Sequence, residues 1–228
     1  YAVGDLHGRY DLLQEIHRLI VADAADAGSS RRLAVYLGDY VDRGPGSADI
    51  VDCLLGDPLP GFESVFLKGN HEDMLLQFVE SGDFADVWLM NGGIATLESY
   101  GLDAAPFVWD RSKVEKTRRA FRSILTPGHL GFFRGLEPFR TVGDYVFVHA
   151  GLRPGVPVDK QHPADCMWIR HEFLDSEASF GGVVVHGHSV VPEPDFRTNR
   201  IAIDTGAYRT DRLTCLVLEG ETRRILQT

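Results

Sequence analysis

In the first half of the chain, short strand-forming runs alternate with apolar residues at helical spacing. The runs that predict strands are residues 1–3, 33–37 and 64–67. A glycine-containing turn follows each run, and an amphipathic helical pattern comes next. The first helical stripe consists of Leu12, Leu13, Ile16, Leu19 and Ile20. Strands therefore begin about every 30 residues, the length of a βαβ unit, and we expect helices that cover a largely parallel sheet. Ser47 directly precedes the second helical stripe and is the expected N-cap of that helix.

Residues 83–140 interrupt this alternation and predict a helical insertion. They contain Trp88, Trp109 and an Asn-Gly-Gly sequence at 91–93. We expect the aromatic residues here to pack into a core beneath the insertion rather than to form a substrate cage. The chain then returns to strand patterns at residues 145–148, 183–185, 201–203 and 214–218. Two mixed sheets packed face to face, with helices outside, accommodate both halves, so residues 1–228 are expected to form one α/β domain.

Composition narrows the class of protein further. Of the 228 residues, 44% are hydrophobic and 25% are charged, as in soluble globular proteins. The net charge of 23 − 33 = −10 argues against nucleic acid or an anionic membrane as a partner. The three cysteines (Cys53, Cys166 and Cys215) are scattered and predict no disulfide framework, which favours a reducing, cytoplasmic compartment.

The apolar runs are short, and the beginning of the chain carries no targeting signal. All the runs are far shorter than the roughly 20 residues that span a bilayer. The chain opens on YAVGDLHG, which has neither an initiator methionine nor a signal-peptide pattern. Residues before Tyr1 and the oligomeric state are left open.

Residues of the types that bind metal follow five of the predicted strands. The clusters are GDLHG at 4–8, GDYVDRG at 38–44, GNHE at 69–72, HAG at 149–151 and HGHS at 186–189. Parallel strands bring their carboxyl ends to one edge of a sheet, where ligands bind. A single Gly-Asp after a strand is usually a turn, but five such clusters together predict a functional site.

The side chains of these clusters suit two divalent ions that share a carboxylate. Asp5 and His7 lie two residues apart, on one side of a strand end, and can chelate one ion. The expected ligands of the second ion are Asn70, His149 and His188. Asp39 can bridge the two ions, as in two-metal hydrolytic sites with ions roughly 3.5–4 Å apart. The mixed donor set favours Mn²⁺, with iron and zinc as alternatives. Two such ions beside Arg43 would make a positively charged site that attracts a phosphate dianion.

These clusters, in this order from Asp5 to Ser189, closely resemble the motifs of the phosphoprotein phosphatase branch of the calcineurin-like metallophosphoesterases. The WLMNGG and TLESYG sequences are similar to those of bacterial members. The resemblance implies a four-layer α/β/β/α sandwich, with the small helical insertion at about 83–140. It also implies the dinuclear ligand set given above, and in-line hydrolysis by a hydroxide that bridges the ions.

The same resemblance implies roles for residues around the ions. His71 matches the family's general acid, and Asp42 matches the carboxylate that orients it. Arg43 matches a phosphate-binding arginine, and Arg170, in Trp168-Ile169-Arg170, resembles the second one. The expected substrate contacts are therefore Arg43, Arg170, Asn70 and His71. His186, two residues before His188, stays open as a further ligand.

Three functions are compatible with such a site. We expect a serine/threonine protein phosphatase that acts on a phosphorylated protein or on small phosphoesters. The alternative is a symmetrical bis(5'-nucleosyl)-tetraphosphatase, a group that usually replaces the residue matching Asp42. A non-catalytic phosphopeptide-binding module is disfavoured because none of the expected ligands is missing.

Overall fold

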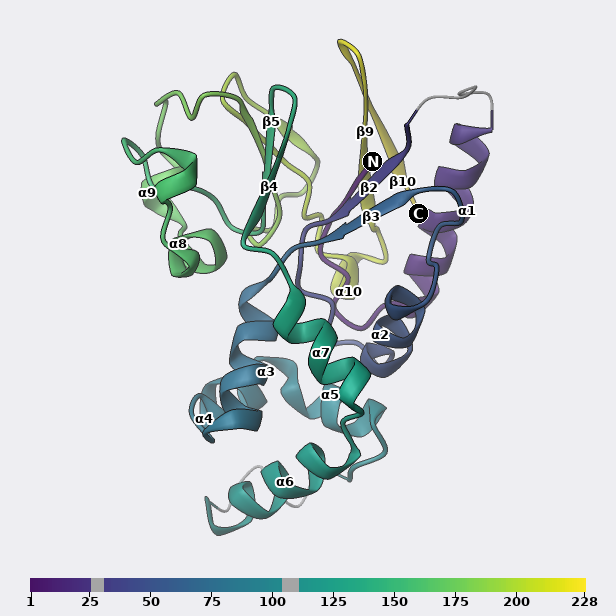
Figure 1. The fold of residues 1–228 in the computed structure, drawn as a ribbon, viewed down its shortest axis with the longest axis vertical. Helices are drawn as coiled ribbons and strands as arrows, with labels where there is room; N and C mark the ends of the chain where they lie inside the picture. Colours follow the sequence, from purple (N-terminus) through teal and green to yellow (C-terminus); the bar gives the residue numbers. More distant parts are fainter. Residues whose placement is uncertain (26–30, 104–110) are drawn as a thin grey trace.

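The computed structural model describes residues 1–25, 31–103 and 111–228, so Trp109 lies outside the described residues. Two five-stranded sheets lie face to face, with helices on the outer side of each sheet and a group of helices at one end (Figure 1). This is the α/β/β/α sandwich that the sequence predicts. None of the helices in the described ranges is long and apolar enough to cross a membrane.

The first sheet has the order β10-β9-β1-β2-β3. Its parallel strands are β1 (Ala2–Val3), β2 (Leu33–Tyr36) and β3 (Glu63–Phe66). The helices α1 (Tyr10–Ala24) and α2 (Ser47–Leu55) connect them. The antiparallel strands β9 (Thr214–Glu219) and β10 (Thr222–Gln227) complete the sheet beside β1.

The second sheet has the order β4-β5-β6-β8-β7. Its parallel strands are β5 (Tyr145–Val148), β6 (Val183–His186) and β8 (Arg200–Ala202). Its antiparallel edges are β4 (Phe139–Val142) and β7 (Asp195–Phe196). The short helices η3 (Val158–Lys160), α8 (Pro163–Trp168) and α9 (His171–Leu174) follow β5, and α10 (Ala207–Thr210) follows β8.

The strands that the sequence analysis missed are β4, β7 and β10. Each lies at an edge and pairs with one neighbour only. An edge strand is partly solvated and needs no continuous apolar run, so β10, with the exposed Arg223 and Arg224, carries no clear strand pattern.

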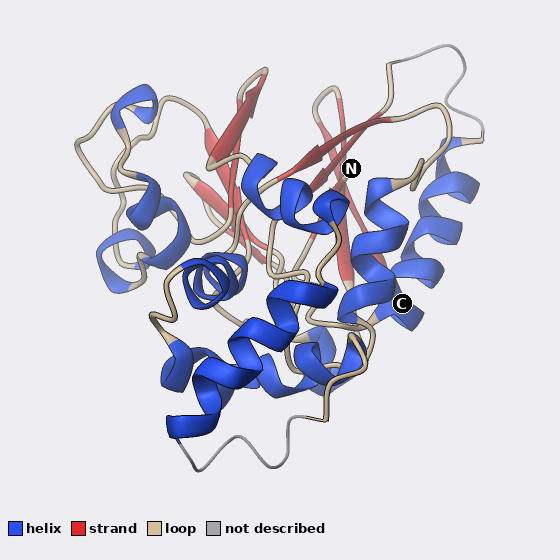
Figure 2. Cartoon of the chain, turned by 60° about the horizontal axis from the view of Figure 1, so that its bottom comes forward, coloured by secondary structure: helices blue, strands red, loops and turns tan. Residues whose placement is uncertain are grey.

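The segment expected to be a helical insertion forms helices beyond the end of both sheets, the end that Figure 2 brings forward. They follow α3 (Asn70–Glu80) in the chain. They are α4 (Ala85–Trp88), the π-helical turn η1 (Leu89–Gly93), α5 (Ile94–Ser99), α6 (Arg111–Ile124) and α7 (Pro127–Gly135). Trp88, Phe121 and Phe133 are fully buried there, which confirms for these residues the expected aromatic core.

The period of two along the strands separates the layers. In β2, Ala34 and Tyr36 pack into the cluster beneath α1 and α2, whereas Val35 packs between the two sheets. In β5, Val146 and Val148 pack toward α8 and α9, and the intervening Phe147 meets the first sheet. Successive side chains of a strand point to opposite faces, so each central strand contributes to two apolar layers.

His17 is a buried histidine that ties α1 to β2. Its Nε2 lies 2.7 Å from the Tyr36 hydroxyl. Burial lowers the pKa of His17 from 6.5 to about 4. The unfolded chain therefore takes up a proton at a pH where the folded chain does not. The stability that neutral His17 contributes is present above pH 6.5 and is lost as the pH falls through 4.

We expect His17→Gln to reduce the acid sensitivity of the fold. Between pH 6.5 and 4, its free energy of unfolding should fall by less than that of the parent, a difference on the order of 3 kcal/mol. Urea unfolding at several pH values in this window measures the effect. His171→Gln is the control, because that side chain is 87% exposed and its loss should leave the parent slope unchanged. Parallel curves for His17→Gln and the parent would contradict the assignment.

Candidate metal centre and active site

The carboxyl ends of the parallel strands bring together the six predicted metal ligands and His71, the predicted general acid. Asp5 and His7 follow β1, Asp39 follows β2, Asn70 and His71 follow β3, His149 follows β5 and His188 follows β6. All seven side chains are buried. Two glycines allow the loops to close: a Cβ on Gly69 would collide with Oδ1 of Asp39, and a Cβ on Gly187 would collide with Oδ1 of Asp5.

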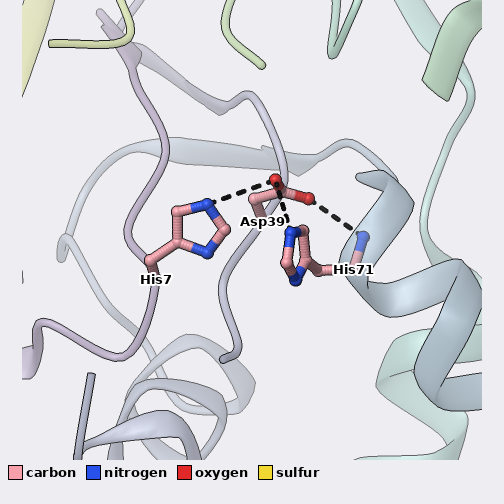
Figure 3. A group of neighbouring side chains, drawn as sticks. All are labelled: His7, Asp39 and His71. Carbon is pink, nitrogen blue, oxygen red and sulfur yellow. Dashed lines mark hydrogen bonds and ion pairs between the residues drawn. The ribbon is translucent and has the colours of Figure 1, made fainter. Parts of the chain in front are cut away.

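Asp39 lies at the centre of this cluster (Figure 3). Its Oδ2 is 3.4 Å from Nε2 of His7 and 3.9 Å from Nε2 of His71. Its Oδ1 is 3.4 Å from Nε2 of His149 and accepts a 3.1 Å hydrogen bond from the backbone N–H of His71. Two groups with ligand atoms within 4.8 Å of one another share this carboxylate: His7–Asp39–His71 and Asp39–His149–His188. Such sharing is the arrangement of a bridging ligand.

The remaining predicted ligands lie beside these two groups. Oδ2 of Asp5 accepts a 3.0 Å hydrogen bond from the N–H of His188, and Asp5 belongs to neither group. Oδ1 of Asn70 lies 3.0 Å from Nε2 of His149. His71, which the sequence predicts as a general acid, lies in the same group of possible metal ligands as His7 and Asp39.

Unpartnered polar atoms test whether the residues fit metal ions. In the described part of the chain, the buried side-chain atoms without a hydrogen-bond partner are Oδ1 of Asp5, Nε2 of His186 and Nε2 of His188. An unpaired buried polar atom costs about 1–3 kcal/mol, a cost that coordination removes. Together with the imidazole, carboxylate and amide donors, these atoms fit divalent transition-metal ions.

The other ring nitrogens fix the orientation of two histidines. Nδ1 of His7 lies 3.0 Å from the carbonyl of Val41, and Nδ1 of His149 lies 2.9 Å from the carbonyl of Leu37. Donation from Nδ1 to a carbonyl leaves the Nε2 lone pair facing Asp39, as metal-binding histidines require. Nδ1 of His186 instead lies 3.1 Å from the carbonyl of Gly187, and its ring packs on Phe173, outside both groups.

Burial and neighbouring side chains shift the pKa values of Asp39 and His188 and so set their charges. Burial would raise the pKa of Asp39, but His149, His71 and His7 outweigh it and hold that pKa well below its usual value. Burial lowers the pKa of His188 to about 2, with a further contribution from His149, so this ring is neutral and available as a ligand.

Asp204 is a further buried acid, which the sequence analysis did not identify. It follows β8 directly, and Gly206 donates a 2.8 Å hydrogen bond to its carboxylate. Burial raises the pKa of Asp204 to about 6, and burial together with Asp204 and Asp39 raises that of Asp5 well above its usual value. The sequence offered the same indication for Asp204 as for the other site residues, because an Asp-Thr-Gly sequence follows the apolar run 201–203.

A second buried pair joins His71 to Asp42. Nδ1 of His71 lies 2.6 Å from Oδ2 of Asp42. Two residues of the helical segment hold this carboxylate from behind: the indole N–H of Trp88 donates to Oδ2 at 2.9 Å, and the hydroxyl of Thr96 donates to Oδ1 at 2.6 Å. The sequence predicts Trp88 only as a core residue and gives Thr96 no role, although both belong to the WLMNGG and TLESYG sequences.

Ser47 corrects one local expectation. The helix α2 begins at Ser47 itself, its N-cap is Gly46, and no side chain caps it. The Ser47 hydroxyl instead accepts a 3.1 Å hydrogen bond from the N–H of Asp42 and lies 3.1 Å from the hydroxyl of Thr96. The residue therefore supports the loop that carries Asp42.

The two predicted arginines come from separate loops. Nη2 of Arg43 lies 3.3 Å from Nε2 of His71, and its guanidinium stacks 4.4 Å over the ring of Tyr208, another residue that sequence analysis missed. Arg170 is exposed, and its Nη1 donates to the hydroxyl of Ser189 at 3.3 Å, next to His188. The structure thus brings Arg170 to the site's rim, whereas Arg43 lies partly buried beside His71.

Backbone strain is concentrated in the same loops. Among the described non-glycine residues with positive φ, five belong to the site: His7, Asp39, Asp42, Arg43 and His188. Such conformations cost about 1–3 kcal/mol each and persist where function fixes a side chain. Glu72 helps to hold the loops, since its buried carboxylate accepts from the backbone N–H groups of Asp39, Tyr40, Val41 and Gly69.

Known proteins resemble this chain in sequence and in fold. It is 43% identical over 94 residues to serine/threonine-protein phosphatase 2 of Escherichia coli (strain K12), a match that covers 41% of this chain and 38% of that protein. It is 24% identical over 240 residues to bis(5'-nucleosyl)-tetraphosphatase PrpE (asymmetrical) of Anoxybacillus flavithermus, covering 94% of this chain and 88% of that protein. The match to the E. coli relative thus spans well under half of that protein's length.

A solved structure described as a candidate diadenosine tetraphosphatase has the same fold. It superimposes with a TM-score of 0.65 at 21% identity, covering 99% of this chain and 91% of that one. The model of the calcineurin-like phosphoesterase family matches residues 1–213. With its strand-end ligands meeting around Asp39 and a family match over nearly its whole length, the chain belongs to the calcineurin-like phosphoesterases, which are phosphoester hydrolases.

Proposed function

We propose that this protein is a metal-dependent phosphomonoesterase that dephosphorylates serine and threonine residues of proteins. The observation that carries the proposal is the buried His71–Asp42 pair beside Arg43. A positioned acid helps most when the leaving group is a strong base, such as the alkoxide of serine. The phosphatase relative in E. coli supports the same substrate class.

The residues that would hold two divalent ions are Asp5, His7, Asp39, Asn70, His149 and His188, with manganese favoured and iron and zinc as alternatives. Bound there, such ions would activate a water as the nucleophile and withdraw charge from the phosphate. The shared carboxylate of Asp39 and the unpartnered atoms of Asp5 and His188 support this assignment.

His71 is the proposed proton donor to the leaving oxygen. Burial would lower its pKa, but the carboxylates of Asp39 and Asp42 outweigh burial and raise that pKa above 6.5. Its Nδ1 is engaged by Asp42, so the proton that can be transferred sits on Nε2. Trp88 and Thr96 hold Asp42, and Asp42 in turn holds the imidazole ring in one orientation.

Arg43 and Arg170 are the proposed phosphate clamp. They reach the ligand cluster from the loop after Asp42 and from the segment between α8 and α9. A guanidinium binds phosphate through two parallel charge-assisted hydrogen bonds and stabilises the charge that develops on the phosphate oxygens. Asn70 and His71 would complete the contacts to the substrate.

Hydrolysis of dinucleoside tetraphosphates is the second candidate. Relatives named for this activity align over most of the chain and are asymmetrical enzymes by name, whereas the sequence analysis considered symmetrical ones. Asp42 favours the protein phosphatase, because a nucleotide leaving group needs less help from an acid. A non-catalytic binding role is less well supported, since every expected ligand is present and buried.

Metal stoichiometry tests the assignment of the bridge. Asp39→Asn should lower the metal content of the manganese-loaded protein from two ions toward one or none, because Asp39 would serve both. His71→Asn should retain both ions, and it is the matched control because His71 lies in the same group. Elemental analysis after gel filtration measures both variants. Loss of an ion in His71→Asn would make His71 a ligand, and two tightly bound ions in Asp39→Asn would place the bridge elsewhere.

The leaving group tests the role of His71. With a phosphoserine peptide, His71→Asn should lower kcat by roughly 10²–10⁴-fold, the usual contribution of a general acid. With p-nitrophenyl phosphate the defect should be much smaller, since nitrophenolate leaves without a proton. Trp88→Phe, which removes one donor to Asp42, should show the same substrate dependence at about tenfold. Equal defects on the two substrates would remove His71 from proton transfer.

A comparison of substrates tests the proposed function itself. The manganese-loaded protein should hydrolyse a phosphoserine peptide with a higher kcat/KM than diadenosine tetraphosphate. Chromatography of the nucleotide products distinguishes symmetrical cleavage, which yields ADP alone, from asymmetrical cleavage, which yields ATP and AMP. A clear preference for the tetraphosphate would overturn the protein phosphatase in favour of the second candidate.

A further inference from the structure

The segment that supports Asp42 on its buried side carries apolar residues on its exposed side. Trp88 of α4 is fully buried and bonded to Asp42. On the same segment, Phe84, Val87 and Met90 are 42%, 47% and 83% exposed. These three residues, spaced three apart, form what we call the α4 ridge. Exposed apolar patches beside an active site commonly mark a binding surface.

A groove is lined by Phe84 of the α4 ridge and by residues of the α8–α9 segment. It has a volume of about 540 Å³, and Phe84, Trp168, Ile169 and Arg170 are among its lining residues. The groove therefore begins at an arginine that we assign to the phosphate. A substrate whose phosphate lies at Arg170 could therefore extend into the groove.

Two neighbouring aromatic rings line this groove. The ring centroids of Phe84 and Trp168 are 6.5 Å apart, and the planes are inclined by 31°. Both side chains are accessible, since Trp168 is 37% exposed and Phe84 is 42% exposed. Together the two rings offer an exposed apolar surface on which a third aromatic ring can pack at a centroid distance of about 4.5–7 Å.

The backbone at Phe84 is strained. Its φ of 59° and ψ of 8° lie in the left-handed region, which is unfavourable for a bulky residue. Most of the other described non-glycine residues in this region belong to the catalytic loops. An exposed ring at a strained position adds little to the core, which favours a role in contact with a ligand.

The charges along the groove favour a peptide over a polyphosphate. Arg153 and Arg170 line it together with Asp165 and Glu172, and Arg153 forms a 2.6 Å ion pair with Asp165. The walls therefore offer no excess of positive charge for further phosphates. A phosphopeptide needs only one phosphate at Arg170, and it can place an uncharged aromatic side chain against the exposed surface of the two rings.

We infer that Phe84 and Trp168 form a specificity site that binds an aromatic side chain close in sequence to the phosphorylated residue of a protein substrate. This inference rests on the proposed protein phosphatase function. The α4 ridge would continue the contact surface for the remainder of the peptide. Since the site touches neither the phosphate nor the ions, its contribution should appear mainly in KM.

A positional scan tests the inference. Phosphoserine peptides carry a single phenylalanine moved through the flanking positions of an alanine-rich sequence, and kcat/KM is measured for each. At one position phenylalanine should raise kcat/KM about tenfold over alanine. Phe84→Ala and Trp168→Ala should bring this ratio close to one, whereas Trp168→Phe, which keeps an aromatic face, should retain most of it. Phe196→Ala is the matched control, because Phe196 is 44% exposed on β7 and should preserve the full ratio.

The outcomes separate the inference from the function on which it rests. If all peptides are hydrolysed but no position discriminates, or if the preference survives Phe84→Ala, the aromatic site is wrong and the phosphatase function stands. If no peptide is hydrolysed while p-nitrophenyl phosphate is, the proposed function fails and the inference fails with it. If Phe84→Ala instead impairs hydrolysis of diadenosine tetraphosphate selectively, the groove binds a nucleoside and the peptide assignment is overturned.

Discussion

The buried carboxylate of Asp39 is the group around which the rest of the site is organised. A charge with so little exposure is costly unless partners surround it, and three histidines from three other strand ends provide them. Asp39 has a positive φ. Glu72 holds the loop because its carboxylate accepts hydrogen bonds from the backbone N–H groups of Asp39 and Tyr40. The two sheets therefore meet at this residue, because His7 and His71 come from the first sheet and His149 from the second.

The helices beyond the sheets are part of the site rather than a lid over it. Trp88 and Thr96 fill the space behind Asp42 with two hydrogen-bond donors, so the His71–Asp42 pair depends on residues far along the chain. The carbonyl of Gly92 also accepts a hydrogen bond from the N–H of Arg43. One short segment thus fixes, on its buried side, the proposed proton donor and the loop that carries Arg43, the proposed phosphate ligand. On its other side it exposes the α4 ridge.

Charge and strain in this protein are local. The chain carries a net charge of −10, yet Arg43 and Arg170 border the ligand cluster. The site would therefore attract an anionic substrate although the protein as a whole is negatively charged. Positive φ angles likewise gather in the loops that carry the ligands, while the strands that end in those loops pair regularly. The regular pairing within the two sheets provides stability that offsets the energetic cost of the strained loops.

The sequence by itself determined the layers and the chemical types in the site. Alternation along the strands, as at Ala34, Val35 and Tyr36, separates the faces of a sheet, and Asp or His after a parallel strand must lie at the same edge. The sequence alone did not reveal β10, because an edge strand needs no apolar run. Nor did it reveal that Trp88 and Thr96 bind Asp42, or that Phe84 lies beside Trp168. Those contacts join residues with no periodic relation in the chain, so only the tertiary structure, which sets the distance between separate elements, decided them.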